Sequence, residues 1–256
     1  MHRNVSDWAG NIAAFAVVIA VNAMANGLPI NGQTTGEVSA KYPSLFTPAG
    51  FTFSIWGLIY LSLTAFVIYQ ALPGQRDNAG IAAVGRLFIL NCLANAAWIF
   101  AWHYDLLLLS LVLMAVILLS LVGIYRFLHA GDDVITAGQR WFVRLPFSLY
   151  TAWITVATIA NISVVQLAMG WDDLGVNAAS WTVLKLALAG AIAAIVVLRR
   201  GDLAFGLVVA WAGYGIMINQ AGTPIVGGAA AMLTALVLLL CVAEFLRPRK
   251  ADRKSI

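Results

Sequence analysis

An apolar segment from residue 86 to residue 102 carries two amides and two indoles that share one helical face. Asn91, Asn95, Trp98 and Trp102 stand four, seven and eleven residues along from the first, which on an α-helix confines them to an arc of roughly 60°. Amides can hydrogen-bond a polar ligand group, and indoles can stack on a flat one. Because the rest of the segment is aliphatic, these side chains need partners that lipid cannot supply. The stripe therefore predicts a cavity wall or a helix–helix contact.

Two further apolar segments carry similar stripes. Trp56 and Tyr60 lie one helical turn apart in the second long apolar segment, and Tyr150, Trp153 and Asn161 share about one quadrant of a helix in the fifth. All three stripes fall at middle-to-outer depth in their segments. Because the three stripes share one depth, we expect them to line one pocket. The candidate ligand-binding residues are therefore Trp56, Tyr60, Asn95, Trp98, Tyr150, Trp153 and Asn161.

Residue patterns typical of catalysis or metal binding do not occur in the chain. It has no H-x-x-x-H pair, paired catalytic carboxylates, Gly-rich phosphate loop or nucleophile elbow. Its two cysteines, Cys92 and Cys241, lie inside apolar segments and far apart, so they predict neither a disulfide framework nor a metal site. We expect a protein that is not an enzyme and has no metal and no covalent cofactor.

The composition identifies the elements that must position these residues. Hydrophobic residues make up 62% of the chain, charged residues only 10%, and the mean hydropathy is +0.89. These values exclude a soluble globular domain and predict an all-α, polytopic membrane protein. The pI of about 9.3 does not indicate nucleic-acid binding, because the basic residues stand between apolar segments, where they determine topology.

Eight membrane spans are predicted from runs of about 20 apolar residues. They cover residues 8–28, 51–71, 81–102, 106–128, 141–169, 179–198, 203–219 and 224–246.

An even number of spans places both termini on one side of the membrane, and the basic residues indicate which side. Only Lys41 and Lys185 fall opposite the termini, whereas thirteen basic residues fall on their side. The thirteen are Arg3, Arg76, Arg86, Arg126, Arg140, Arg144, Arg199, Arg200, Arg247, Arg249, Lys250, Arg253 and Lys254. By the positive-inside rule we expect cytoplasmic termini, in a prokaryotic plasma membrane. The first span, although it resembles a signal peptide, is expected to be retained.

The longest connection, residues 29–50, follows the first span and faces outside. It is rich in Gly, Thr, Pro and Asn, so we expect no helix of its own. Since the other outer connections are short, it is either a lid over the pocket or a plain connector.

Structural roles compete with ligand binding for several of these residues. Tryptophan often marks the membrane interface, and asparagine within a span often holds helices together. For Asn95 and Asn161, helix contact and pocket lining are equally expected. Asn91 is interpreted as a helix contact, and Trp102 as an interface residue at the cavity rim.

The three stripes resemble motifs of the TspO/MBR family, the tryptophan-rich sensory proteins that include the translocator protein or peripheral-type benzodiazepine receptor. The resemblance covers roughly residues 8 to 170. The second span matches at Pro48, Trp56 and Tyr60, the third at Asn95 and Trp98, and the fifth at Tyr150, Trp153, Ala157, Thr158 and Asn161. The chain departs from the pattern at Leu45 and Thr47, at the spacing of Pro146, and at Ile162 and Ser163, where the family has its proposed cholesterol motif.

The resemblance implies a TspO-like five-helix domain in residues 1–170, three additional helices in residues 171–246 and a basic tail in residues 247–256. It implies a sensor or carrier that binds a tetrapyrrole, porphyrin-like ligand in a cavity under the long loop. Trp56 and Asn95 would supply polar contacts, and Trp98 and Trp153 stacking walls. Membrane lipids are expected partners, and a homodimer stays open.

A secondary transporter for a small hydrophobic molecule is the alternative. It would use the same cavity together with the additional spans, and it would depend on Lys185 or Glu244. Repeated halves and discontinuous helices are typical of such transporters, and the sequence shows no convincing repeat. Tetrapyrrole breakdown, which the resemblance suggests, is the one enzymatic role that stays open.

Overall fold

The computed structural model describes residues 5–28, 30–75, 78–130, 135–171 and 175–247. Every regular element in these ranges is a helix, which confirms the all-α prediction. The principal helices are α1 (Val5–Gly27), α3 (Ile55–Ala71), α4 (Ala79–His103), α5 (Leu107–Leu128), α7 (Leu145–Ala168), α8 (Ala178–Arg200), α9 (Leu203–Asn219) and α10 (Pro224–Leu246). The short elements are η1 (Ile30–Gly32), α2 (Thr35–Ala40), η2 (Gly50–Ser54), η3 (Pro73–Gln75), α6 (Ala137–Gln139) and η4 (Arg140–Arg144).

Seven helices of the described chain are long and apolar enough to cross a membrane, and α9 is a shorter apolar helix. With 17 residues, α9 is about 25 Å long, less than the roughly 30 Å of a bilayer core. Much of it is buried against α7, α8 and α10. Protein rather than lipid therefore surrounds most of its surface.

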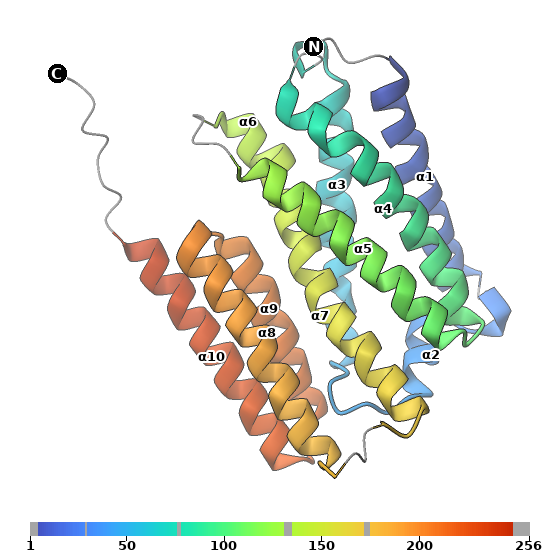
Figure 1. Ribbon diagram of the computed structural model, residues 1–256, viewed down its shortest axis with the longest axis vertical. Coiled ribbons are helices and arrows are strands. Elements are labelled where there is room, and N and C mark those ends of the chain that lie inside the picture. The colour runs from blue at the N-terminus through green and yellow to red at the C-terminus, as the bar shows by residue number, and fades with distance from the viewer. Residues whose placement is uncertain (1–4, 29, 76–77, 131–134, 172–174, 248–256) are drawn as a thin grey trace.

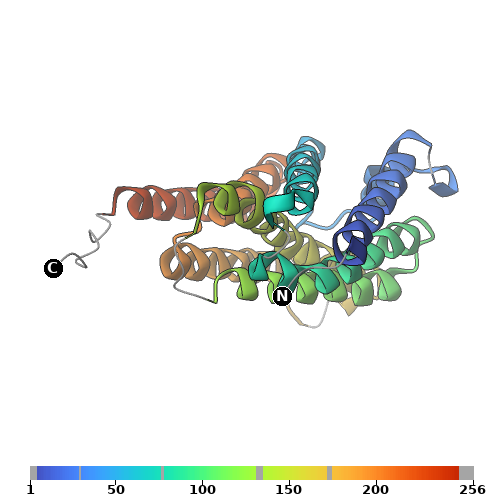
Figure 2. The ribbon, with the colours of Figure 1, turned by 90° about the horizontal axis from the view of Figure 1, so that it is seen from above.

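The principal helices form two neighbouring groups (Figure 1). In the first, α4 packs against α1 and α5, while α7 packs against α5 and α3; in the second, α8, α9 and α10 pack against one another. The two groups meet mainly through α7 and α9. Seen from above, α1 and α3 lie on one side of the first group, with α4 and α5 on the other (Figure 2).

Small residues allow close packing within the second group. A Cβ at Gly190 would stand 2.7 Å from the Leu233 side chain, and one at Gly206 would stand 2.5 Å from the Cys241 sulfur. Real Cβ atoms do not approach so closely, so glycine at these positions lets α8 and α9 lie directly against α10. Gly190 thus gives α8 a small-residue packing face toward α10.

Asp202 joins the two groups at the end of the bundle where α1 begins. Its carboxylate caps α9 by accepting the Phe205 backbone N–H at 3.1 Å. It also accepts hydrogen bonds from the Tyr125 hydroxyl of α5 at 2.8 Å and the Ser148 hydroxyl of α7 at 2.7 Å. One side chain therefore satisfies a helix end and ties α9 to α5 and α7.

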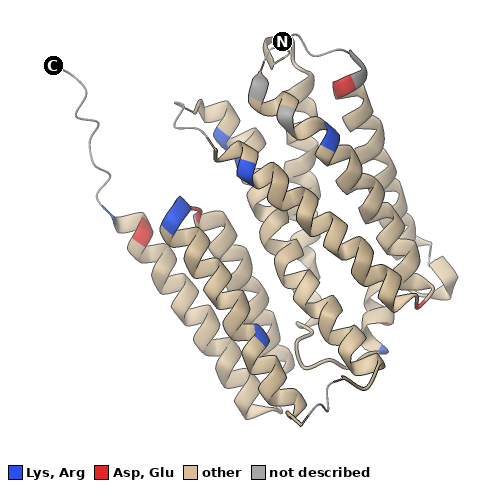
Figure 3. Ribbon diagram, viewed as in Figure 1, with Lys and Arg blue, Asp and Glu red and all other residues tan. Residues whose placement is uncertain are grey.

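Helix α1 begins and α10 ends at the same end of the bundle, and most described Lys and Arg residues gather there (Figure 3). At the opposite end lie Lys41 and Asp105, which form an ion pair. This distribution agrees with an even number of crossings and with charge-determined topology.

The prediction that residues 29–50 contain no helix is wrong, because α2 forms within them. Thr34 and Glu37 make a reciprocal capping box, in which the Thr34 side chain accepts the Glu37 N–H and the Glu37 carboxylate accepts the Thr34 N–H. Val38 then anchors the helix in a buried cluster with Trp102. Capping and one apolar contact outweigh the loop-like composition.

Candidate functional site

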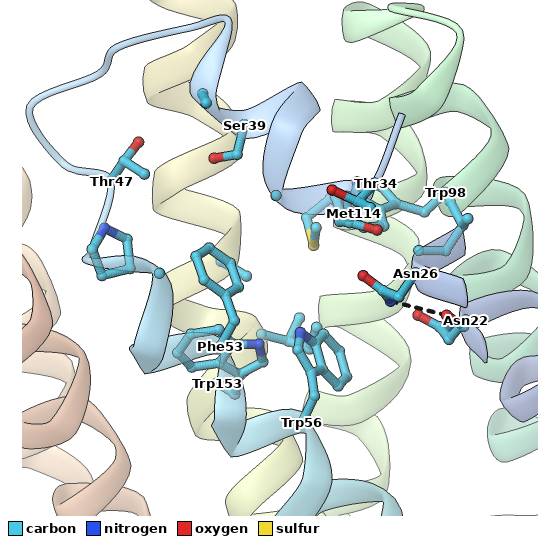
Figure 4. Close-up of a pocket in the computed structure, with 18 of the residues that line it drawn as sticks. Asn22, Asn26, Thr34, Ser39, Thr47, Phe53, Trp56, Trp98, Met114 and Trp153 are labelled. Atoms are coloured by element: carbon cyan, nitrogen blue, oxygen red, sulfur yellow. Dashed lines mark hydrogen bonds between the residues drawn. The ribbon is translucent and has the colours of Figure 1, made fainter. Parts of the chain in front are cut away.

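A cavity of about 1030 Å³ lies between α1, α3, α4, α5 and α7, beneath the 30–50 segment. Figure 4 shows side chains from several of these elements around it. Residues of the segment line it from Thr34 to Gly50, so this connection covers the cavity and is called the lid below. The volume is just above the range typical of ligand sites, about 300–1000 Å³.

Five of the seven candidate binding residues line this cavity. They are Trp56, Tyr60, Asn95, Trp98 and Trp153. Asn161 lines only a smaller adjoining pocket of about 70 Å³, which shares Trp98 and Trp153 with the main one. Tyr150 lines neither pocket and is buried behind Asn95. The structure thus brings the three sequence stripes together around one space.

The aromatic rings at the deep end pack in fixed orientations. Trp56 stacks on Tyr60 with ring centroids 5.2 Å apart and planes 22° apart. Trp153 meets Trp56 edge-on at 6.3 Å and 80°, and Phe53 meets Trp153 at 5.8 Å and 83°. The rings of this cluster thus pack both face to face and edge to face, the two arrangements that aromatic rings favour.

Asn95 both lines the cavity and holds helices together. Its carbonyl oxygen accepts a hydrogen bond from the Asn22 amide of α1 at 3.0 Å, and its own amide donates to the Tyr150 hydroxyl of α7 at 2.9 Å. One side chain in α4 therefore links three cavity helices. Asn91, in contrast, donates to Ser120 and to the Ile117 carbonyl of α5, as its interpretation as a helix contact predicted.

Trp98 is positioned by a second polar cluster. Its indole N–H donates to the Asn161 carbonyl oxygen at 3.3 Å, and the Asn161 amide donates to the Ser110 hydroxyl at 3.1 Å. Asn161 is thus a positioning residue that holds one cavity wall.

Trp102 lines the smaller adjoining pocket, which agrees with its predicted place at the cavity rim. It is not exposed at a membrane interface, so that part of the prediction is wrong. Only 5% of its surface is exposed, its ring stacks on Trp98 at 5.4 Å, and its N–H donates to the Thr35 carbonyl of the lid at 3.3 Å. The physical reason is α2, which covers the indole.

The lid is fastened to the turn between α4 and α5. Lys41 forms an ion pair with Asp105 at 2.8 Å, and the Tyr42 hydroxyl donates to the same carboxylate at 3.0 Å. Asn31 donates to the His103 carbonyl at 2.9 Å. The hydrogen bond from Lys41 lowers the pKa of Asp105, whereas burial, and then the hydrogen bond to Asp105, raises the pKa of Tyr42.

Helix α9 fastens the other end of the lid. The Ala49 N–H donates to the Gly215 carbonyl at 3.0 Å, and the Asn219 amide donates to the Thr47 carbonyl at 2.9 Å. Trp211 donates to the Thr52 carbonyl, also at 3.0 Å. Asn219 and Gln220 themselves reach the cavity wall, so the second helix group helps build the site.

Sequence reasoning missed several lining residues. Asn22 and Asn26 of α1, Phe53 of η2 and Met114 of α5 all line the cavity. The spacing of the two asparagines, one helical turn apart, is a signal that could have identified them. Met114 carries no such signal, because its position depends on how α5 crosses α4.

Charged side chains are absent from the cavity lining among the described residues. No group of three or more residues there could hold a metal ion either. What the site offers is aromatic surface, carboxamides, hydroxyls and indole N–H groups. Such a site can bind and orient a flat apolar molecule with a few polar atoms.

Comparison with known families identifies the chain. A family model described as "TSPO-like protein" matches residues 7–243, which takes in both helix groups. No curated protein and no solved structure matches the chain. The match agrees with the resemblance carried by the tryptophan and asparagine motifs of the second, third and fifth spans. This integral membrane protein therefore belongs to the TSPO-like protein family.

Proposed function

We propose that this protein binds a planar, hydrophobic, porphyrin-like ligand in the cavity under the lid, and acts as a sensor or carrier for it. The observation that carries the proposal is the convergence of Trp56, Trp98 and Trp153 from three helices on one space of about 1030 Å³. Packed aromatic clusters of this kind are costly to leave facing an empty volume and well suited to stacking on a flat ligand.

The arrangement of the lid supports a binding role. Contacts to the α4–α5 turn and to α9 hold it over the cavity, and its own residues form part of the lining. The lid would cover one side of a ligand held on the aromatic floor, while the cavity stays partly open to its surroundings.

Tryptophan fluorescence of the purified protein tests this proposal. Micromolar porphyrin should quench the wild-type emission, and Trp56→Ala should weaken binding at least about tenfold because the stacked Trp56–Tyr60 pair is lost. Trp141→Ala is the matched control, since Trp141 is 61% exposed and lies outside the cavity. Absence of saturable quenching in the wild type would sink the proposal.

The proposed orientation places both termini in the cytoplasm of a prokaryotic plasma membrane. It rests on the basic residues at the end where α1 begins and α10 ends. A fluorescent reporter that matures only in the cytoplasm, fused after residue 256, should be bright. A dark but stably inserted fusion would reverse the orientation.

A further inference from the structure

The cavity contains no group that could neutralise a charged ligand. Its polar lining side chains are amides, hydroxyls and indoles, and none of the described lining residues is Lys, Arg, His, Asp or Glu. A carboxylate that enters such a site loses its hydration without gaining an opposite charge. An uncharged ligand of the same shape loses much less hydration free energy when it enters the cavity.

The charged side chains on the lid side of the cavity do not favour an anion either. Glu37, Lys41 and Asp105 lie at this end on the lid and the α4–α5 turn, and together they carry one net negative charge. The Lys41 ammonium is already paired with Asp105 at 2.8 Å. A ligand carboxylate here would therefore compete with Asp105 for the nearest cation and would be repelled by two acidic side chains.

The deep end offers a hydrogen-bond donor. Trp153 is 2% exposed, lines the cavity beside Trp56 (Figure 4), and its indole N–H has no hydrogen-bond partner among the described residues. The Tyr60 hydroxyl is also buried and also has no hydrogen-bond partner among these residues. Because an indole N–H can only donate, a ligand atom that pairs with it would be an acceptor.

We propose that the ligand enters this cavity uncharged and carries a carbonyl-type oxygen at its leading end, which accepts a hydrogen bond from Trp153. The proposal rests on the proposed function and narrows it. Among porphyrin-like molecules, the neutral esters and ketones fit this site, whereas the free dicarboxylic acids do not. An ester or ketone oxygen is a good acceptor that costs little to desolvate.

Two porphyrins with the same ring system, one a diacid and one its dimethyl ester, provide the first test. Protoporphyrin IX and its dimethyl ester should both be titrated against the full-length protein in nanodiscs of neutral lipid at pH 8, with tryptophan quenching as the readout. The ester should bind at least about tenfold more tightly. Equal or tighter binding of the diacid would overturn the inference and leave the proposed function standing. Absence of quenching by either would overturn both.

A cation placed in the wall provides a matched pair of variants. Asn26 lines the cavity near the outer end of α1, while Leu28, two residues on, is 71% exposed and does not line it. Asn26→Lys should improve binding of the diacid about tenfold, since it supplies the missing countercharge. Leu28→Lys should leave the preference unchanged. An equal gain in both variants would show general attraction at the surface and would contradict the inference.

Replacing the Trp153 indole by an aromatic ring without a donor tests the deep contact. Trp153→Phe keeps an aromatic ring but loses the donor, so it should weaken binding of the dimethyl ester about fivefold. Binding of pyrene, a flat hydrocarbon without an acceptor, should change by less than about twofold in the same variant. If both ligands weaken equally, Trp153 acts through packing alone and its assignment as a donor fails.

Discussion

At the scale of single residues, the cavity depends on side chains that hold one another. Asn95 joins Asn22 of α1 to Tyr150 of α7, and Asn161 holds Trp98 through a similar bond. In a low-dielectric interior such bonds are strong, and each unsatisfied member is costly. The amide network therefore sets the distances between the cavity helices. The indole side chains line the cavity between these helices.

Removing the Tyr150 hydroxyl should expose this dependence. In Tyr150→Phe the Asn95 amide keeps its position but loses its acceptor, so we expect the protein to lose about 1–3 kcal/mol of stability. Thermal unfolding in detergent, followed by circular dichroism, measures the loss. Tyr104→Phe is the control, because Tyr104 is 55% exposed. Equal melting temperatures for the two variants would contradict the assigned role of Asn95.

The Asp105 contact predicts a pH dependence of the lid. Lys41 lowers the pKa of Asp105, so the contact is fully formed above the ordinary pKa of about 3.9 and is lost as pH falls through the lower folded value. We expect lid amides in residues 35–42 to exchange faster below about pH 4, after correction for intrinsic exchange rates.

The variant Asp105→Asn should reproduce that loss at pH 7. Asparagine suits this position because Asp105 has a positive φ of 55°, which asparagine tolerates. Hydrogen exchange followed by mass spectrometry measures both effects. A lid as protected in Asp105→Asn as in the wild type would show that the ion pair does not hold it.

At the scale of elements, α9 connects the second helix group to the site. Its residues Gly215, Trp211 and Asn219 bond to the backbone of the lid and of η2. These bonds fix the segment that leads into Phe53 and Trp56. The additional helices are thus part of the cavity's support.

Gly215 is the point of closest approach in this contact. A Cβ there would collide with the Thr52 side chain, so Gly215→Ala should displace η2, cost about 1–3 kcal/mol of stability and weaken porphyrin binding. Gly228→Ala is the matched control, since a Cβ on this α10 glycine meets nothing within 4 Å. Thermal melting and quenching titrations measure both variants. Equal behaviour of the two would mean that α9 does not support the site.

At the scale of the whole molecule, the sequence predicted the principal helices well because long apolar segments locate them. The sixth predicted span, 179–198, differs from α8 (Ala178–Arg200) by three residues in all. The stripes at Trp56, Asn95 and Trp153 also predicted one shared space. The division into residues 1–170 and 171–246 remains a prediction, although the family match runs across it.

What sequence reasoning missed depends on contacts between distant segments. Asn219 reaches the lid at Thr47, 172 residues away in the chain, and no local pattern encodes that meeting. Trp102 looked like an interface residue because its helix ends there, yet a lid helix covers it. That helix could have been predicted from Thr34 and Glu37, whose spacing is a capping-box signature.

Mass spectrometry of the small molecules that co-purify in mild detergent tests the central claim most directly. We predict a flat, polycyclic or tetrapyrrole compound that accompanies the wild type and Trp141→Ala but is depleted in Trp56→Ala, since Trp56 lines the cavity and Trp141 does not. Phospholipid alone, in equal amounts in all three proteins, would contradict the claim that this cavity is a binding site.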